Sequence, residues 1–178
     1  MPYYAPNVTF MFREGDTVPE NGVCPIGGKF VAKTSEELFA NKKVIIFGLP
    51  GAFTPTCSTY QLLGFEEKYE EFKSLGIDEI YCISVNDAFV MNEWARQLGI
   101  KNVKMIPDGN GDFTRLMGML VSKSKLGFGL RSHRYAAVIT DMIREKLFVE
   151  EGREDNFGSD PYGESSPETV MDYLKSTK

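Results

Sequence analysis

The stretch Val44-Ile-Ile-Phe-Gly-Leu-Pro50-Gly-Ala-Phe-Thr-Pro-Thr-Cys57-Ser joins an apolar run to a turn and then to an amphipathic segment. The almost uninterrupted apolar run over residues 43–49 is typical of a parallel strand buried on both faces. The prolines predict a turn, so Cys57 should stand at the start of the next helix. A thiol there meets unpaired amides and the positive end of the helix dipole, which favour the thiolate. We therefore interpret Cys57 as a nucleophile.

The segment after Cys57 repeats apolar residues at helical spacing. Leu62, Phe65, Tyr69 and Phe72 recur at steps of three and four, with charged residues opposite. Gly76 is typical of a helix C-cap and predicts where this helix ends. Over about thirty residues, the pattern therefore predicts a strand, a turn and a helix, with the cysteine at the start of the helix.

Strands and helices alternate through the rest of the chain. Apolar runs predict strands at residues 79–85 and 103–106, and an adjacent antiparallel pair at 135–140 and 146–149. Capping residues and apolar stripes predict helices that follow Thr34, Asp87 and Ser166, and a further helix at 113–120.

The N-terminal part predicts a β-hairpin. Residues 8–13 and 29–32 have strand-like content and are joined by a Gly- and Pro-rich loop that carries Cys24. Together with the alternating elements, this predicts one α/β domain over residues 1–178, a mixed sheet flanked by helices. The active edge should be at the C-terminal ends of the parallel strands, where Cys57 falls.

Composition restricts the class of function. The chain has 178 residues, 42% hydrophobic and 25% charged, with a net charge of -5, which argues against a general binder of nucleic acid or anionic membranes. Its N-terminus lacks the pattern of a signal peptide, and no apolar run is long enough to span a membrane, so we expect a cytoplasmic protein. Three separate cysteines predict neither a disulfide framework nor a zinc site, and no cofactor is expected.

The spacing Pro50-x-x-x-Thr54-x-x-Cys57 resembles the peroxidatic motif of the peroxiredoxins, in the type 5 (plant type II) branch with a thioredoxin-like fold. Further segments are similar to that branch in sequence and order, at residues 84–94, 106–109, 127–129 and 131–135. The similarity covers roughly residues 44–150. It implies a thiol peroxidase for hydrogen peroxide and small alkyl hydroperoxides, acting in antioxidant defence and redox homeostasis.

The resemblance also implies roles for individual residues. Cys57 would attack the peroxide and become a sulfenic acid, while the permanently charged Arg134 would stabilise the thiolate and the polarised oxygens. Thr54 would orient the peroxide through its hydroxyl. Pro50 and Pro55 would stiffen the turn and remove amides that attract water. The substrate pocket would also include Thr56 and Phe128, although Phe128 fits core packing equally well.

The sequence gives less information on the reductant that returns the Cys57 sulfenic acid to the thiol. No cysteine follows Cys82, and Phe157 stands in the loop where some relatives carry a resolving thiol, so we expect an external reductant: glutathione with glutaredoxin, or thioredoxin. Cys82 lies in an apolar strand and is interpreted as an inert core residue. Cys24 is either an incidental exposed thiol or a residue that takes part in resolution or glutathionylation.

Four other residues need an interpretation. His133 could form a Cys57/His133 dyad, as in thiol hydrolases or transferases, but strand neighbours point to opposite faces, so it should not share the direction of Arg134. Arg131 either holds Arg134 or lies on the surface. Gln61 stands where many relatives have histidine, so no imidazole is expected beside the sulfur. Trp94 is assigned to the core.

Three functional hypotheses follow. The first is the thiol peroxidase, forming a homodimer through the loops near Phe53 and Met117, as the resemblance implies. The second is a thioredoxin-like disulfide reductase, which normally needs a Cys-x-x-Cys motif, whereas position 54 here is threonine. The third is a non-enzymatic redox sensor in which oxidation of Cys57 changes a partner surface.

Overall fold

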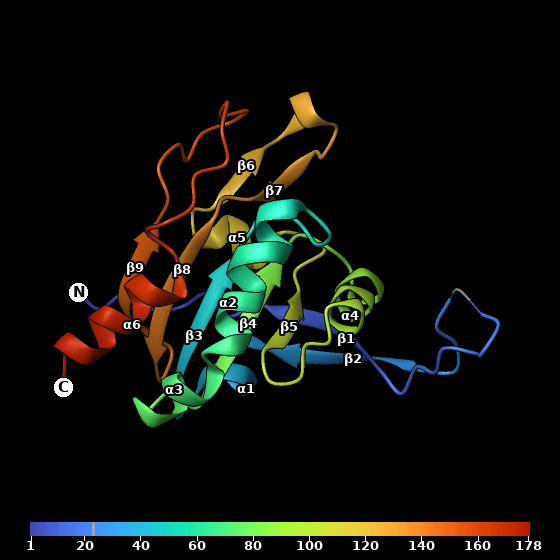
Figure 1. Ribbon diagram of the computed structural model, residues 1–178, viewed down its shortest axis with the longest axis horizontal. Helices are drawn as coiled ribbons and strands as arrows, with labels where there is room; N and C mark the ends of the chain where they lie inside the picture. The colour runs from blue at the N-terminus through green and yellow to red at the C-terminus, as the bar shows by residue number, and fades with distance from the viewer. Residues whose placement is uncertain (23) are drawn as a thin grey trace.

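A computed structural model describes residues 1–22 and 24–178 and shows an α/β architecture around a five-stranded mixed sheet (Figure 1). Three strands are parallel neighbours, and the antiparallel pair β8 and β9 extends the sheet beside β3. The strand order is β5 (Lys104–Pro107), β4 (Glu79–Ser84), β3 (Lys43–Gly48), β8 (Tyr135–Thr140) and β9 (Ile143–Val149). The predicted mixed sheet is therefore confirmed.

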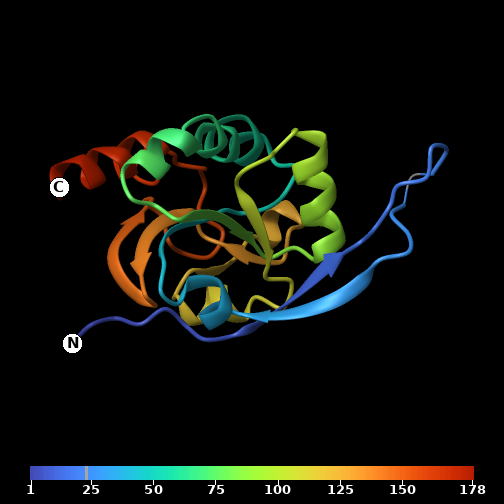
Figure 2. The same cartoon turned by 90° about the horizontal axis from the view of Figure 1, so that it is seen from below.

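Helices cover both faces of this sheet, as Figure 2 shows from below. One face packs against η1 (Cys57–Leu62), α2 (Leu63–Glu67), α3 (Tyr69–Ser74), α4 (Ala88–Gln97) and α6 (Pro167–Ser176). The other packs against α1 (Ser35–Phe39) and α5 (Asp112–Leu116). Within the described part of the chain, no helix has the length and apolarity needed to cross a membrane.

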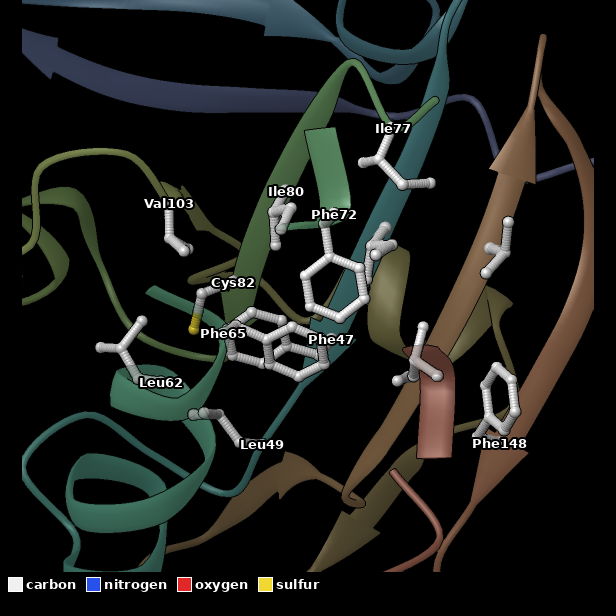
Figure 3. Packing of buried hydrophobic residues seen from close by; sticks show 14 of the residues in the cluster. Phe47, Leu49, Leu62, Phe65, Phe72, Ile77, Ile80, Cys82, Val103 and Phe148 are labelled. Carbon is white, nitrogen blue, oxygen red and sulfur yellow. The ribbon is translucent and has the colours of Figure 1, made fainter. Parts of the chain in front are cut away.

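Side chains of β3 alternate between the two cores, as expected for a strand buried on both faces. Ile45 and Phe47 enter the core beneath η1 and α2, whereas Val44 and Ile46 enter the opposite one. The ring of Phe47 stacks on that of Phe65 with centroids 4.3 Å apart (Figure 3). This stacking fixes the helix that carries Cys57 against the strand that precedes it.

The predicted hairpin consists of β1 (Thr9–Glu14) and β2 (Lys29–Thr34), paired in antiparallel register. Residues 15–22 and 24–28 connect the two strands and extend away from the sheet (Figure 1). Cys24 lies in this connection and is exposed. The hairpin is thus a separate two-stranded sheet, and its Phe10 packs into the core on the α1 and α5 side of the central sheet.

The prediction of a helix over residues 113–120 is wrong in its second half. The helix α5 ends at Leu116, and β6 (Leu120–Ser122) pairs with β7 (Leu130–Ser132). Gly118 has a φ of +74°, in the left-handed region that glycine enters without strain. It ends the helix and redirects the chain into β6. A short 3₁₀ turn, η2 (Ser124–Leu126), lies between β6 and β7.

Candidate active site

The link between β3 and the following helix places Cys57. β3 ends at Gly48, and the first helical turn begins at Pro55, so that the carbonyl of Thr54 accepts a hydrogen bond from Ser58 N at 3.0 Å. Proline suits this first turn because its missing N–H would have no partner there. Cys57 follows in the same turn, with its side chain completely buried. The predicted position at the start of a helix is confirmed.

Arg134 reaches the same place from a distant part of the chain. It directly precedes β8, in the two-residue link after β7, and its neighbour Tyr135 pairs with Gly48. This register places Arg134 beside the end of β3, where the loop to Cys57 begins. Its Nη1 donates to Cys57 Sγ at 3.4 Å and to Gln61 Oε1 at 2.8 Å.

Arg134 carries its charge in a buried position, with only 2% of the side chain exposed. Burial opposes ionisation, but the nearby Cys57 and Asp160 outweigh it and raise the pKa of Arg134 above its usual value. Nη2 donates to both carboxylate oxygens of Asp160, at 2.8 and 2.9 Å. Nε–H is buried and has no partner among the described residues. One donor of the guanidinium is therefore unused.

Thr54 lies in the cavity wall with a free acceptor on its hydroxyl oxygen. Its hydroxyl donates to the carbonyl of Gly51 at 2.8 Å, so its oxygen is left to accept a hydrogen bond. It lines a cavity of about 470 Å³ whose walls include Pro50, Pro55 and Phe128. Thr56, predicted to share this pocket, does not line it, and neither does the fully buried Cys57.

Arg131 braces the loop instead of holding Arg134. Its Nε donates to the carbonyl of Phe128 at 3.0 Å, and Nη1 donates to the carbonyl of Pro50 at 3.3 Å. A Cβ at Gly51 would lie 2.6 Å from that Nη1, so a larger residue there would displace the Arg131 guanidinium. Arg131 thus fixes the Pro50 end of the cavity, a role that neither predicted alternative included.

Buried hydrogen bonds hold the helix that carries Cys57. Trp94 lies in the core as predicted, and its indole N–H donates to the hydroxyl of Ser58 at 2.9 Å. On the other side, Gln61 Nε2 donates to the hydroxyl of Ser165 at 3.2 Å, and that hydroxyl donates to Glu150 at 2.8 Å. A chain of polar contacts therefore connects Arg134, through Gln61, to the start of α6.

The carboxylate of Glu150 is the anchor of this polar chain. Burial opposes its ionisation, but hydrogen bonds from Ser165 and Gly163 offset the effect and bring the pKa of Glu150 below its ordinary 4.5. Its stabilising contribution is therefore complete above that value and is lost as the pH falls through the folded-state pKa.

We expect Glu150→Gln to lower the free energy of unfolding by about 1–3 kcal/mol at pH 7, because charge-assisted hydrogen bonds are replaced by neutral ones. The variant should also lose less stability than the wild type between pH 4.5 and acid unfolding. Urea unfolding as a function of pH measures both effects. The neighbouring exposed Glu151→Gln is the control, and equal acid sensitivity of all three proteins would contradict this assignment.

The other candidate side chains are placed away from the sulfur. The ring of His133 contacts the carbonyl of Glu150 at 2.7 Å, and burial lowers the pKa of His133, which favours the neutral imidazole. Among the described residues, Cys57 has no hydrogen bond to His133, so no dyad forms. Burial raises the pKa of Cys82 well above its usual value, in agreement with an inert core thiol.

Two partners of Arg134 were not predicted from sequence. Gln61 was noted only for replacing a histidine, yet it accepts a hydrogen bond from Arg134. Asp160 lies in the irregular loop before α6, where no periodicity or motif indicates which side chain turns inward. A lone acidic residue in a polar loop is usually solvated, so nothing in the sequence distinguished this one.

Known proteins are similar to this chain over most of its length. Residues 13–160 match the Redoxin family. A peroxiredoxin of Rhizobium etli is 56% identical over 175 residues, which cover 98% of this chain and 96% of that protein. Peroxiredoxin-2B of Arabidopsis thaliana is 44% identical over 143 residues, covering 79% and 88% of the two chains. The solved structure of the Plasmodium falciparum antioxidant protein (1-Cys peroxiredoxin) has a TM-score of 0.89 at 38% identity and covers 99% of both chains.

These similarities extend well beyond the short motif around Cys57 and cover most of the chain. They agree with the thioredoxin-like fold and with the plant type II resemblance of the sequence. The chain belongs to the redoxin family as a peroxiredoxin, a thiol-dependent peroxidase.

Proposed function

We propose that Cys57 is the peroxidatic nucleophile and that Arg134 stabilises both its thiolate and the breaking O–O bond. The observation that carries this proposal is the 3.4 Å contact between Sγ and Nη1, made in a buried site next to the cavity. A guanidinium stays protonated under all relevant conditions and offers fixed donors. In a site with little water, such a charge acts more strongly than it does in solution.

The chemical step transfers one oxygen to sulfur. The thiolate attacks one peroxide oxygen, an S–O bond forms, and the O–O bond breaks. The leaving hydroxide or alkoxide takes a proton and departs as water or alcohol. Sulfur is oxidised by two electrons to the sulfenic acid, and the peroxide is reduced by two.

Thr54 and the free donor of Arg134 would orient the peroxide for this attack. The Thr54 oxygen can accept a hydrogen bond from the peroxide, because its own hydrogen is committed to Gly51. Arg134 Nε–H, buried without a partner among the described residues, can donate to a peroxide oxygen. Pro50 contributes a wall of the cavity that offers no N–H to water.

The decisive experiment mixes the reduced protein with hydrogen peroxide in a stopped-flow instrument. A peroxidase consumes the Cys57 thiol with a second-order rate constant far above that of free cysteine, and mass spectrometry with a sulfenic-acid trap locates the product at this residue. Oxidation no faster than that of free cysteine at the same pH would leave only a sensor or scaffold role.

We further propose that an external thiol recycles the sulfenic acid. The thiol forms a mixed disulfide with Cys57 and releases water, and a second thiol then reduces that disulfide. Cys82 is enclosed in the core, and Cys24 lies in the exposed hairpin connection. The similar Plasmodium falciparum protein is named a 1-Cys peroxiredoxin, which agrees with recycling without a second cysteine of the same chain.

Cys24→Ser tests this proposal directly. We expect turnover with glutathione plus glutaredoxin, or with thioredoxin, to stay within about 2-fold of the wild type, because the exposed loop thiol takes no part in resolution. Coupled assays with each reductant on both proteins measure the rates and rank the two systems. A tenfold loss with one reductant in the variant would identify Cys24 as a resolving residue.

The remaining proposals concern the whole protein. The 470 Å³ cavity is large enough for small alkyl hydroperoxides as well as hydrogen peroxide. We propose a single cytoplasmic domain that forms a homodimer through the loops near Phe53 and Met117, where Phe53 and Leu116 are exposed and Met117 is buried. Sedimentation velocity with Phe53→Glu tests this interface, and an unchanged dimer would exclude it.

A further inference from the structure

Asp160 forms an ion pair with the arginine of the active site. It lies in the loop between β9 and α6, and both of its carboxylate oxygens accept hydrogen bonds from Arg134 Nη2. The partners differ in exposure, at 2% for the arginine side chain and 47% for the aspartate. A charge of the opposite sign therefore stands at the solvent side of the guanidinium, while Cys57 stands at its buried side.

The donors of Arg134 divide between these partners. Among the residues that the structure describes, Nη1 donates to Cys57 and Gln61, and Nη2 donates to Asp160. Both carboxylate oxygens contact the single Nη2 nitrogen, at 2.8 and 2.9 Å, in a charge-assisted interaction. Among the described residues, the Cys57 sulfur contacts one guanidinium nitrogen, at 3.4 Å, an ordinary length for a hydrogen bond to sulfur. In the resting site, Arg134 thus contacts Cys57 and Asp160 at the same time, through different nitrogens.

The other titratable groups around this pair do not reproduce the effect of Asp160. Burial raises the pKa of Tyr162 to about 12, so the phenol facing Arg134 stays neutral. The thiol of Cys82 is held protonated by burial, and the ring of His133 is held neutral. Glu150 directs its carboxylate to Ser165 and Gly163, and Lys123 is the cation that lines the same small cleft as Arg134 and Asp160.

We propose that Asp160 is a positioning residue that competes with the Cys57 sulfur for the charge of Arg134 and holds the resting thiol less ionised than the guanidinium alone would. Like charges on opposite sides of one cation disfavour each other's ionised state, although the cation stabilises both. Asp160 also restricts the rotation of the guanidinium, which fixes the direction of Nη1 and Nε–H.

The role in the reaction rests on the proposed function of Cys57. During attack, negative charge moves from sulfur to the leaving oxygen, and the Arg134 guanidinium must then stabilise the charge on that oxygen. Asp160 is half-exposed, so its carboxylate can move into water at little cost when the peroxide oxygens require the guanidinium. The loop aspartate would therefore tune the activation of the thiol without touching the substrate.

The test compares Asp160→Asn with Asp155→Asn in a Cys24→Ser background. The asparagine at position 160 still accepts a hydrogen bond from Arg134 but removes the charge. Asp155 belongs to the same loop and accepts from Ser122 N at 2.7 Å, away from Arg134. The midpoint of Cys57 ionisation is followed by the ultraviolet absorbance of the thiolate against pH, in the absence of peroxide.

We expect Asp160→Asn to lower this midpoint by about one pH unit and Asp155→Asn to leave it unchanged. Below the wild-type midpoint, the rate constant with hydrogen peroxide should rise about 2- to 5-fold, because more thiol is ionised but each thiolate is a weaker nucleophile. Asp160→Glu, which retains the charge, should titrate like the wild type.

An unchanged or raised midpoint in Asp160→Asn would overturn the proposal and leave the ion pair a purely structural contact. A similar fall in Asp155→Asn would also overturn it, since net charge alone would then explain the effect. Because the midpoint is measured without peroxide, it separates the failure of this inference from a failure of the proposed function. The latter would appear as slow oxidation at every pH.

Discussion

Replacing Cys57 with serine is expected to reduce peroxide turnover by at least about 1,000-fold, to the level of the uncatalysed background. An alcohol is far less acidic than a thiol and is not an effective nucleophile toward an O–O bond, so the remaining donors have no reaction to assist. Coupled turnover and stopped-flow peroxide consumption measure the loss. The change of sulfur to oxygen is small, and the site should keep its fold.

Cys82→Ala is the matched control for this substitution. It removes a second buried thiol from the same core, and its cost should appear in thermal stability rather than in activity. Circular dichroism on both variants separates folding from chemistry. Peroxide reduction that persists in Cys57→Ser, or disappears in Cys82→Ala while the fold is retained, would contradict the assignment of the nucleophile.

Arg134→Met is expected to lower the rate constant with hydrogen peroxide by about 100- to 1,000-fold. Removing a preorganised donor of this kind from a buried site typically costs that much, and here the thiolate loses its cation at the same time. The variant also leaves Gln61 Oε1 without its donor, which should cost about 1–3 kcal/mol in the free energy of unfolding.

Arg134→Lys separates charge from geometry. An ammonium ion restores the positive charge but cannot reproduce the planar fork that contacts Cys57, Gln61 and Asp160 together. We expect it to recover no more than about a tenth of the wild-type rate. The exposed Arg153→Gln serves as the control. A pH profile that stays unchanged in Arg134→Met would show that the helix N-terminus alone activates the sulfur.

Much of this fold follows from local patterns in the sequence. The apolar run that became β3 and the repeat that became the following helix are long and regular, so their positions were predicted closely. The six-residue π-helical turn at Cys57–Leu62 was not predicted, because π-helical turns are rare and occur as single turns within α-helices. The end of α5 was missed because the glycine at position 118, which adopts a left-handed φ, was not read as a helix end.

The site itself combines local and distant contributions. Cys57 and Thr54 belong to one short motif, so the sequence places them together. Arg134 lies 77 residues further on, and it was expected there only because of the family resemblance. Neither local pattern nor family resemblance indicates the ion pair between Asp160 and Arg134, because the inward direction of Asp160 depends on a loop without regular structure.

The complete burial of the Cys57 sulfur affects which step limits the rate of the catalytic cycle. A peroxide is small enough to diffuse to the sulfur through the folded protein, but the active site of a protein reductant is not. The Trp94–Ser58 hydrogen bond and the stacked rings of Tyr60 and Tyr162 hold the helical turn that carries Cys57, so a protein partner gains access only when this region opens locally. After a sudden rise in peroxide concentration, each chain would therefore react once at the full oxidation rate. Its reduction would then be limited by the rate of local opening around Cys57.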